Sequence, residues 1–449
     1  MNGQWSVGCR ASSRLRGLHA CLSEEKIHAI LGQRFLTRYC KRVLNVDLVW
    51  LIVGFGLFAD KSYRGIFRLC HDQSVEVPCR ATLTAARKRI SADLIRLLAE
   101  GVICLLARSA SSDPSSYYGG LKLMAVDGTL LDCPDSPANR REFGRVENQN
   151  GLSAYPKVRV ISLCEIGTRV LWRSVIGTYH QSEQKLVLPL LEQLSPGMLL
   201  LADRHFGVAP IIYRLIKRKV SFLIRVKKTQ CFPVEKRLPD GSYLSTIYRH
   251  KNDRRSGRPG QIVRVIRYQH NDSNRPHCGE VHVLVTNLLD PIKFPALELI
   301  DLYHQRWEEE LAFSEWKILM CKKRVLRSQS PEGVRQELWG MLISHFIIRK
   351  LIFDAVKKSQ IPPSTISFTE AFEILHARLP DAPRSQHRRK RWLRYLLAEI
   401  RREQLPPRAN RINPRKVKKR TKARKTKRDS DRSPPKPKGR FIDQVQISI

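Results

Sequence analysis

Two aspartates follow short apolar runs, where a buried strand is expected to end. Asp127 comes directly after the run 121–126, and Asp203 directly after the run 198–202. Ligands of α/β sheets usually bind at the carboxyl ends of the strands, so both carboxylates are expected at the mouth of a sheet. Taken singly, each aspartate is more simply explained as a turn or helix-capping residue. Their function therefore depends on what else lies nearby.

A third acidic group stands on a segment with helical character, 296–323. Four of its residues are offset by 0, 3, 7 and 14 positions: Tyr303, Arg306, Glu310 and Lys317. At about 100° per residue these offsets fall within roughly 60° of one another, so one helix face carries all four side chains. Three other glutamates are expected to point away from this face: Glu308, Glu309 and Glu315. For an isolated helix, the simplest interpretation is a solvated, salt-bridged surface.

The chain carries a large positive charge. Its 449 residues include 81 Lys and Arg against 41 Asp and Glu, which gives a formal charge of +40 and an isoelectric point near 10.3. Residues 411–440 hold 15 Lys or Arg and two Asp, a local +13, so most of the charge lies elsewhere. Such a field attracts polyanions, of which nucleic acid is the first to consider. Charge alone does not decide, because ribosomal and membrane-surface proteins share it.

The element pattern predicts a mixed α/β protein with helical flanks. Strands come first and then alternate with helices, which is typical of a mixed sheet. In chain order we predict a loosely ordered start (1–21), a helical N-terminal domain that is a candidate for DNA contact (22–108), a mixed-sheet core in two pieces (117–227 and 288–356) interrupted by a β-rich insertion (228–287), a helical basic region (357–405) and a disordered basic tail (406–449).

Strand Asp, strand Asp and helix Glu with flanking Arg and Lys occur here in a strongly basic chain. This order resembles the DDE transposases, specifically the insertion-sequence-four family of cut-and-paste elements. The family's Tyr-x2-Arg-x3-Glu-x6-Lys signature is matched from Tyr303 to Lys317. Its Asp-Gly-Thr element is matched at 127–129 and its Asp-Arg-x-Phe element at 203–206. The resemblance covers roughly residues 25–355.

The resemblance implies a ribonuclease-H-like core and metal-dependent cutting of DNA. Asp127, Asp203 and Glu310 would be the catalytic residues and would hold two ions per site, Mg²⁺ or alternatively Mn²⁺, about 3.5–4 Å apart. The implied reaction is hydrolysis at the inverted-repeat ends of the element, followed by attack of the freed 3′-hydroxyl on target DNA. The implied partners are these two kinds of DNA and a second copy of the chain in the DNA-bound complex.

The same resemblance assigns DNA contacts. Tyr303, Arg306 and Lys317 would grip phosphate at the element end, with Arg acting as a fork and Lys as a point charge. Arg204 and His205 are weaker candidates for contact with the DNA backbone, and His205 is equally well explained as structural. The basic segment 384–440 would add non-specific phosphate contacts, with a merely solvated tail as the alternative.

Excision in this family passes through a DNA hairpin, and a flipped base then needs an aromatic partner. Relatives use a Trp in the β-rich insertion, whereas residues 228–287 contain none. Five other rings could substitute for it: Phe232, Tyr243, Tyr248, Tyr268 and His282. The hairpin step is therefore a weaker expectation than the cutting step.

Two alternatives remain at the level of the sequence. One is a metal-dependent DNA nuclease on the same fold without strand transfer, and the other is a non-catalytic nucleic-acid-binding protein. The eleven Cys are scattered as singletons without a CxxC pair, as is usual in a reducing cytosol. The longest apolar run, 48–59, is too short to cross a bilayer. The expected location is therefore the cytoplasm, in association with the nucleoid, and not a membrane.

Overall fold

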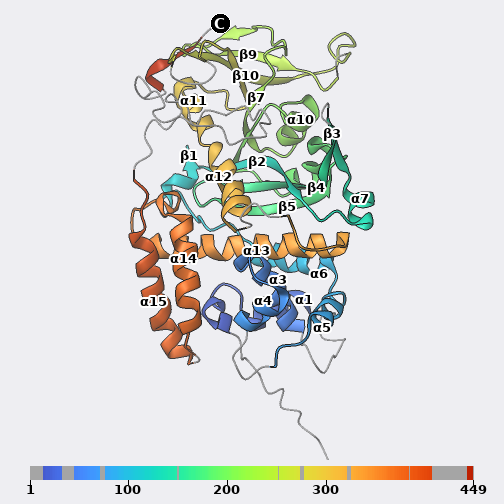
Figure 1. Ribbon diagram of the computed structural model, residues 1–449. Coiled ribbons are helices and arrows are strands. Elements are labelled where there is room, and N and C mark those ends of the chain that lie inside the picture. Colours follow the sequence, from blue (N-terminus) through green and yellow to red (C-terminus); the bar gives the residue numbers. More distant parts are fainter. Residues whose placement is uncertain are drawn as a thin grey trace, which may run out of the picture.

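The computed structural model describes residues 14–32, 45–70, 76–148, 151–250, 252–273, 278–320, 325–383, 385–406 and 442–447. Figure 1 shows a mixed sheet in the middle of the molecule, a β-rich extension at one end and a group of N-terminal helices at the other. This combination confirms the predicted α/β class. Among the described residues, none of the helices has both the length and the apolar character that a bilayer-crossing segment needs.

The order of the central strands defines the core. These strands are β2 (Leu121–Asp132), β4 (Gly151–Glu165), β5 (Val170–Thr178), β6 (Met198–Ala202) and β7 (Ser221–Val226). They lie side by side as β5-β4-β2-β6-β7, with antiparallel pairing from β5 to β2 and parallel pairing from β2 to β7. In chain order this is 3-2-1-4-5, the arrangement expected of a ribonuclease-H-like core, and it confirms that expectation.

Helices cover both faces of these strands. Met124 and Val126 of β2 face a core that includes α8 (Glu183–Leu186), α9 (Leu188–Leu191) and α10 (Ala209–Lys217). Leu123 and Ala125 face the opposite core, which includes α11 (Ala296–His304). Successive residues of a strand point to opposite faces, so a strand buried on both sides forms an unbroken apolar run. This is why the sequence indicated β2 and β6 so clearly.

The β-rich insertion continues the same sheet. β11 (His282–Thr286) pairs antiparallel with β7, and three further strands follow outward: β10 (Gln261–His270), β9 (Tyr243–Ile247) and β8 (Lys236–Arg237). The described residues thus form one 12-stranded sheet. The insertion and the central strands are parts of a single hydrogen-bonded surface.

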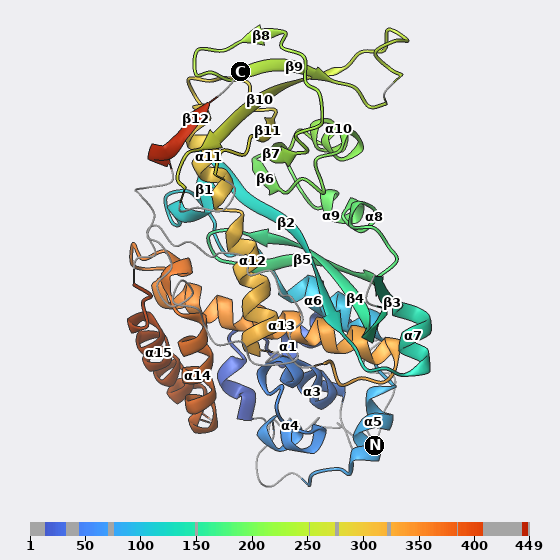
Figure 2. The same ribbon diagram turned by 45° about the horizontal axis from the view of Figure 1, so that its top comes forward.

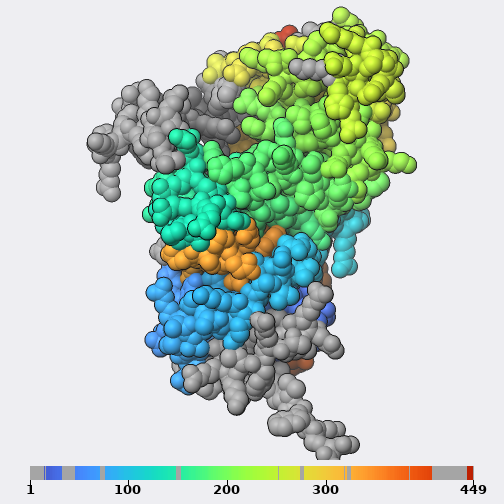
Figure 3. Space-filling view, turned by 90° about the vertical axis from the view of Figure 1, so that its right-hand side faces the viewer, coloured from blue at the N-terminus to red at the C-terminus, as the bar shows by residue number. Residues whose placement is uncertain are grey.

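A long helix, α13 (Pro331–Val356), lies between the sheet and the N-terminal helices. In Figure 3 its orange surface forms a band between the teal strand region and the blue helices. It packs on α3 (Asn45–Leu57) and α6 (Ala92–Val102), and Ser344 Oγ donates a hydrogen bond to the carbonyl of Val53 at 2.6 Å. A Cβ on Gly340 would lie 2.3 Å from the carbonyl oxygen of Ile52, so the two helices meet backbone to backbone.

Two of the N-terminal helices begin at a serine N-cap. Ser23 and Ser91 accept hydrogen bonds from the backbone N–H groups of Lys26 and Leu94 at 3.1 and 3.2 Å, which is the expected N-cap geometry. The remaining elements are 3₁₀ turns at Arg14–Leu18, Pro114–Ser116, Pro363–Thr365 and Leu379–Asp381, helices α1 (Glu24–Leu31), α4 (Tyr63–Cys70), α5 (Arg80–Arg87), α7 (Pro137–Phe143), α14 (Phe368–Arg378) and α15 (Gln386–Arg402), and strands β1 (Tyr117–Tyr118) and β3 (Arg145–Asn148).

The single long helix expected over 296–323 is wrong. α11 ends at His304, α12 (Trp307–Ser314) follows after a tight turn, and Glu315–Met320 is wound as a π-helix. Between them the N–H of Arg306 bonds to the carbonyl of Tyr303 and that of Glu309 to the carbonyl of Arg306, which is 3₁₀ spacing. The tighter 3₁₀ winding before α12 and the looser π winding after it turn the following side chains in opposite directions about the helix axis.

The predicted disordered tail, 406–449, needs one correction. Residues 442–447 form a 3₁₀ turn (Ile442–Gln444) and strand β12 (Val445–Ile447), which pairs antiparallel with β10 (Figure 2). Val445 and Ile447 pack against the core beneath α11, and this apolar burial explains why the segment is ordered. Residues 1–13 and 407–441 lie outside the described residues, as do the predictions made for them.

Candidate active site

The two aspartates lie side by side where the parallel pairing of β2 with β6 ends. Val126 of β2 is paired with Ala202 of β6, and the next residues are Asp127 and Asp203. β6 ends at Ala202 as expected, whereas β2 continues to Asp132 as the antiparallel partner of β4. The expectation that Asp127 follows the end of its strand is therefore wrong. Paired strands lie about 4.8 Å apart, and the charge of Asp203 acts on Asp127. Asp203 also shapes a turn, because its Oδ1 accepts the backbone N–H of His205 at 2.9 Å. The structure thus places both carboxylates at the mouth of the sheet.

Asp127 occupies a position that favours its protonated form. Burial is the main cause that raises the pKa of Asp127 to about 6, and the charges of Asp203 and Glu310 add to the effect. The backbone N–H of Gly128, 2.7 Å from Oδ1, and the guanidinium of Arg306 act in the opposite direction. Carboxylates that repel one another in this way are stabilised by a cation placed between them.

Arg306 connects the strand aspartate to the helix glutamate. Its Nη1 lies 3.5 Å from Oδ2 of Asp127, and its Nη2 lies 2.9 Å from Oε1 of Glu310. Only 10% of the Arg306 side chain is exposed, so the guanidinium is held inside the site. Glu310 comes from α12, which packs against β2. The helix face expected from the sequence therefore meets the middle of β2, beside the end of β6.

The other two residues of that helix face contact the end of β6 and the middle of β2. The Tyr303 hydroxyl donates a hydrogen bond to the carbonyl of Ala202 at 3.3 Å. Burial raises the pKa of Tyr303 to about 12, so its hydroxyl remains a donor at neutral pH. Lys317 Nζ lies 3.0 Å from Oγ1 of Thr129, two residues beyond the first aspartate. All four residues of the predicted signature are thus brought to the mouth of the sheet.

Arg204 and His205 lie beside this group on the surface. Both side chains are exposed, and the backbone carbonyl of His205 accepts a hydrogen bond from Gln184 Nε2 at 2.9 Å. They flank the carboxylates, and their contact with DNA stays a prediction.

The chemistry of the donor set fits a hard divalent cation. Carboxylate oxygens are the ligands that Mg²⁺ prefers. Three carboxylates approach this place, from the middle of β2, from the residue after β6 and from α12. In the described part of the chain, no three acidic, His or Cys side chains yet surround a common point. The guanidinium of Arg306 lies between Asp127 and Glu310 and pairs with both.

Comparisons with known proteins agree with this geometry. The family described as Transposase DDE domain matches residues 118–347, more than half of the chain, and this stretch includes all three carboxylates. The chain belongs to the DDE transposase family. A second family, described as Insertion element 4 transposase N-terminal, matches residues 12–100. The predicted resemblance is thereby confirmed, and the protein is an enzyme of a family whose domains generally use divalent metal ions.

Individual relatives show the extent of the likeness. The Transposase InsG for insertion sequence element IS4, from Escherichia coli, is 28% identical over 366 residues, which cover 80% of this chain and 81% of that protein. A cryo-EM structure of the piggyBac transposase synaptic complex with hairpin DNA overlaps 89% of this chain and 86% of its own, at 13% identity and a TM-score of 0.40.

Sequence reasoning missed a buried ion cluster behind the acidic helix of this DDE transposase. Glu315 accepts hydrogen bonds from Arg349 Nε at 2.9 Å, from Arg169 Nη1 at 3.2 Å and from His345 Nε2 at 3.3 Å. Burial alone would raise the pKa of Glu315, but these partners outweigh it and lower the pKa to about 2. The cluster fastens the first residue of the π-helix to α13. Its members come from three distant parts of the sequence, so no local pattern indicated it.

Three other glutamates of this segment were expected to point away from the helix face that carries Glu310, and this is correct for two of them. Glu308 pairs with Arg169, and Glu315 belongs to the buried cluster. Glu309 is different, because it is fully buried and close to Asp127, and these two effects raise its pKa well above the usual range. The irregular turn at 305–306 rotates this residue toward the strand. A regular helix wheel could not have predicted that position.

The candidate aromatic residues of the insertion differ in exposure. Four of them are at most 8% exposed: Phe232, Tyr243, Tyr268 and His282. Tyr248 is only half-buried and lines a cavity of about 180 Å³ together with Phe232. Tyr248 is therefore the member of this set whose ring is most open to a base.

Proposed function

We propose that this transposase cuts the ends of an insertion sequence and joins the freed 3′-hydroxyls to target DNA. The observation that supports this most directly is the meeting of Asp127, Asp203 and Glu310 at one sheet mouth, with Arg306 bridging two of them. The relative from Escherichia coli, named as a transposase for an insertion sequence element, supports the choice of substrate.

Asp127, Asp203 and Glu310 would hold two divalent ions, Mg²⁺ or Mn²⁺. Such ions activate the attacking oxygen and neutralise the charge of the reacting phosphate. The chain's own residues then hold the DNA: Arg306 offers a bidentate fork to a phosphate once the carboxylates have another cation, and Lys317 adds a point charge beside Thr129. The Tyr303 hydroxyl, anchored on the Ala202 carbonyl, keeps α11 against the strand end.

Excision through a DNA hairpin is the finer part of the proposal. A flipped base would stack on an accessible aromatic ring, and the half-buried Tyr248 offers such a ring beside a cavity. The two ends of an element must be held together, so the working unit would be a homodimer on DNA, in the cytoplasm at the nucleoid. The helical N-terminal domain and the exposed Arg204 and His205 would add contacts to the DNA backbone.

One experiment separates this function from a metal-dependent nuclease. Purified protein, Mg²⁺, labelled element ends and a supercoiled target are incubated together, and the products are resolved on denaturing and native gels. We expect cut ends followed by labelled ends joined to the target. Cut ends without any joined product would contradict strand transfer and support the nuclease.

A second prediction concerns the basic helix α15. Arg388, Arg391 and Arg394 are exposed on it, and we expect them to contact phosphates without reading sequence. Changing all three to Gln should weaken binding to any duplex DNA and reduce the slope of log K against log salt by up to about 3, since each phosphate contact contributes about 0.9. Fluorescence anisotropy at several salt concentrations measures this slope. An unchanged slope would show that these side chains are only solvated.

A further inference from the structure

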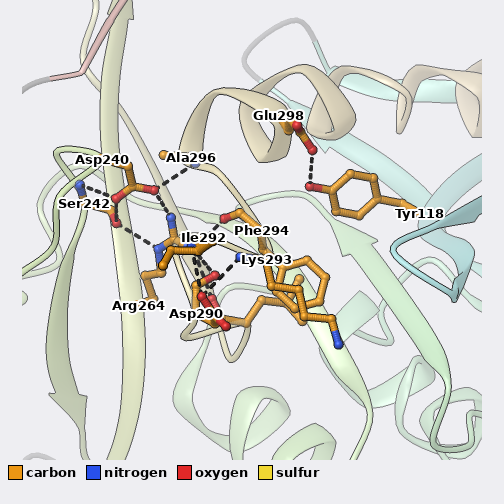
Figure 4. Close-up of polar contacts among 11 residues, drawn as sticks. Tyr118, Asp240, Ser242, Arg264, Asp290, Ile292, Lys293, Phe294, Ala296 and Glu298 are labelled. Carbon is orange, nitrogen blue, oxygen red and sulfur yellow. Dashed lines mark hydrogen bonds and ion pairs between the residues drawn. The ribbon is translucent and has the colours of Figure 1, made fainter.

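A buried guanidinium ties the insertion to the segment that leads into α11 (Figure 4). Arg264 on β10 is 0% exposed. Its Nη1 donates to three backbone carbonyl oxygens of that segment, at 3.2, 3.4 and 2.7 Å: those of Leu288, Asp290 and Phe294. Its Nε donates to Oγ of Ser242 at 2.8 Å, and its Nη2 is paired with Asp240. A single side chain therefore fixes both the loop before α11 and the start of β9.

Asp240 extends this tie to the helix itself. Its Oδ2 accepts the backbone N–H of Ala296, the first residue of α11, at 2.9 Å, and the two residues are 56 positions apart in the chain. The N-cap residue of α11 is Pro295, which makes no side-chain capping bond. The carboxylate thus caps the helix from the insertion, and its negative charge suits the positive end of the helix dipole.

The opposite end of α11 lies at the acidic site. The helix is nine residues long, about 13 Å, and Tyr303 in its last turn reaches the carbonyl of Ala202. Leu299 and Ile300 are fully buried against a face that the central strands and the insertion strands share. A displacement at Ala296 would therefore be carried along a short, packed helix to the residues just beyond Tyr303.

Resting on the proposed function, we propose that Arg264 and Asp240 are positioning residues for DNA cleavage. They set the start of α11 and thereby the place of Arg306 and Glu310, so the geometry of the insertion and the geometry of the carboxylates are linked. The hydrogen bond from the Tyr118 hydroxyl to Glu298, at 2.8 Å, is a second and more exposed tie between α11 and the sheet (Figure 4).

The first test removes the cap. In Asp240→Ala we expect single-turnover cleavage at saturating element-end DNA to fall 10- to 100-fold, because misplacement of catalytic groups by about 1 Å can cost 10²-fold. The dissociation constant for the same DNA should change less than about threefold, since Arg306 is only one of several proposed phosphate contacts and those of α15 lie away from α11. Hydrogen exchange should become faster in the first turn of α11. Unchanged cleavage and unchanged exchange in the folded variant would overturn the proposal.

A matched control lies in the same insertion. Arg258 pairs with Asp253 at 3.2 Å and is 69% exposed, away from the start of α11. Arg258→Ala should leave cleavage, DNA binding and exchange in α11 as in the unchanged protein. Loss of cleavage in this control equal to that in Asp240→Ala would show a general effect of the insertion and would contradict a positioning role.

A double variant separates positioning from mere stability. Asp240→Ala alone leaves the Arg264 charge buried without its carboxylate, whereas Asp240→Ala with Arg264→Met removes both charges. The double variant should recover much of the lost urea midpoint and still cleave slowly, because α11 has lost its cap. Cleavage that recovers together with stability would refute the proposal. If the unchanged protein cuts no DNA at all, the proposed function fails, while the exchange measurement still tests the tie to α11.

Discussion

Replacing Asp127, Asp203 or Glu310 by its amide is expected to abolish strand cleavage and to leave DNA binding intact. Each change removes one anionic ligand from the sheet mouth without changing the size of the side chain. We expect the cleavage rate to fall on the order of 10³-fold or more, which corresponds to about 4 kcal/mol of transition-state stabilisation. Cleavage of labelled element ends with Mg²⁺ measures the rate, and anisotropy measures the affinity.

The control for these variants is Asp93→Asn. Asp93 is an exposed carboxylate on α6, with 81% of its side chain accessible. The Asp93→Asn protein should therefore cut DNA at the normal rate. If any of the three site variants kept cleavage within about tenfold of the unchanged protein, that residue would not belong to the metal-holding set. Loss of DNA binding together with cleavage would point instead to a folding defect.

The largest expected effect on stability comes from Glu315→Gln. This change leaves Arg349 and Arg169 buried beside a neutral amide, and loss of one partner from a buried ion cluster costs about 3–5 kcal/mol. Urea unfolding at pH 7 measures the difference. The matched control is Glu399→Gln, which breaks an exposed pair with Arg378 and should leave the unfolding midpoint unchanged.

The loss of stability in Glu315→Gln should also depend on pH. The pKa of Glu315 is lowered to about 2 in the folded protein from the ordinary value of 4.5. Its charge therefore stabilises the fold fully above about pH 4.5, and this contribution is lost as the pH falls toward 2. The stability gap between the unchanged protein and Glu315→Gln should narrow by about 1.4 kcal/mol per pH unit below pH 4.5. A gap independent of pH in that range would show that folding does not lower the pKa of Glu315.

The sequence was most informative where apolar residues follow one another along a strand. The apolar runs before Asp127 and Asp203 predicted the first half of β2 and the whole of β6, because strands buried on both faces consist largely of apolar residues. The second half of β2 is only partly buried, and the sequence did not indicate it. The ribonuclease-H-like fold came from the family resemblance, and the 3-2-1-4-5 order of the strands confirms it. The residues from Tyr303 to Lys317 that were expected on one helix face do lie together at the site. The helix that carries them is interrupted by a 3₁₀ turn and a π-helix, which the spacing of the residues did not predict.

The remaining features depend on partners far away in the chain. The buried pairs Glu315–Arg349 and Arg264–Asp240 join segments separated by 34 and 24 residues, and the sequence shows them only as ordinary charged residues. Glu309 lies close to Asp127 because of the turn before α12. β12 forms because it pairs with the edge of β10. Tertiary contacts of this kind are chosen by the completed fold, not by local pattern.

The packing of α13 on α3 has a consequence for folding during synthesis of the chain. Ser344 and its acceptor Val53 are 291 residues apart, so a ribosome working at about 5–20 residues per second separates them by roughly 15–60 s. During that time the apolar surface of α3, whose residues from Leu48 to Leu57 are almost all buried in the finished protein, has no α13 to cover it. A nascent chain that already contains all three acids at residue 310 is therefore still unfinished. Forty-six further residues, up to the end of α13 at Val356, are needed before α3 can be covered.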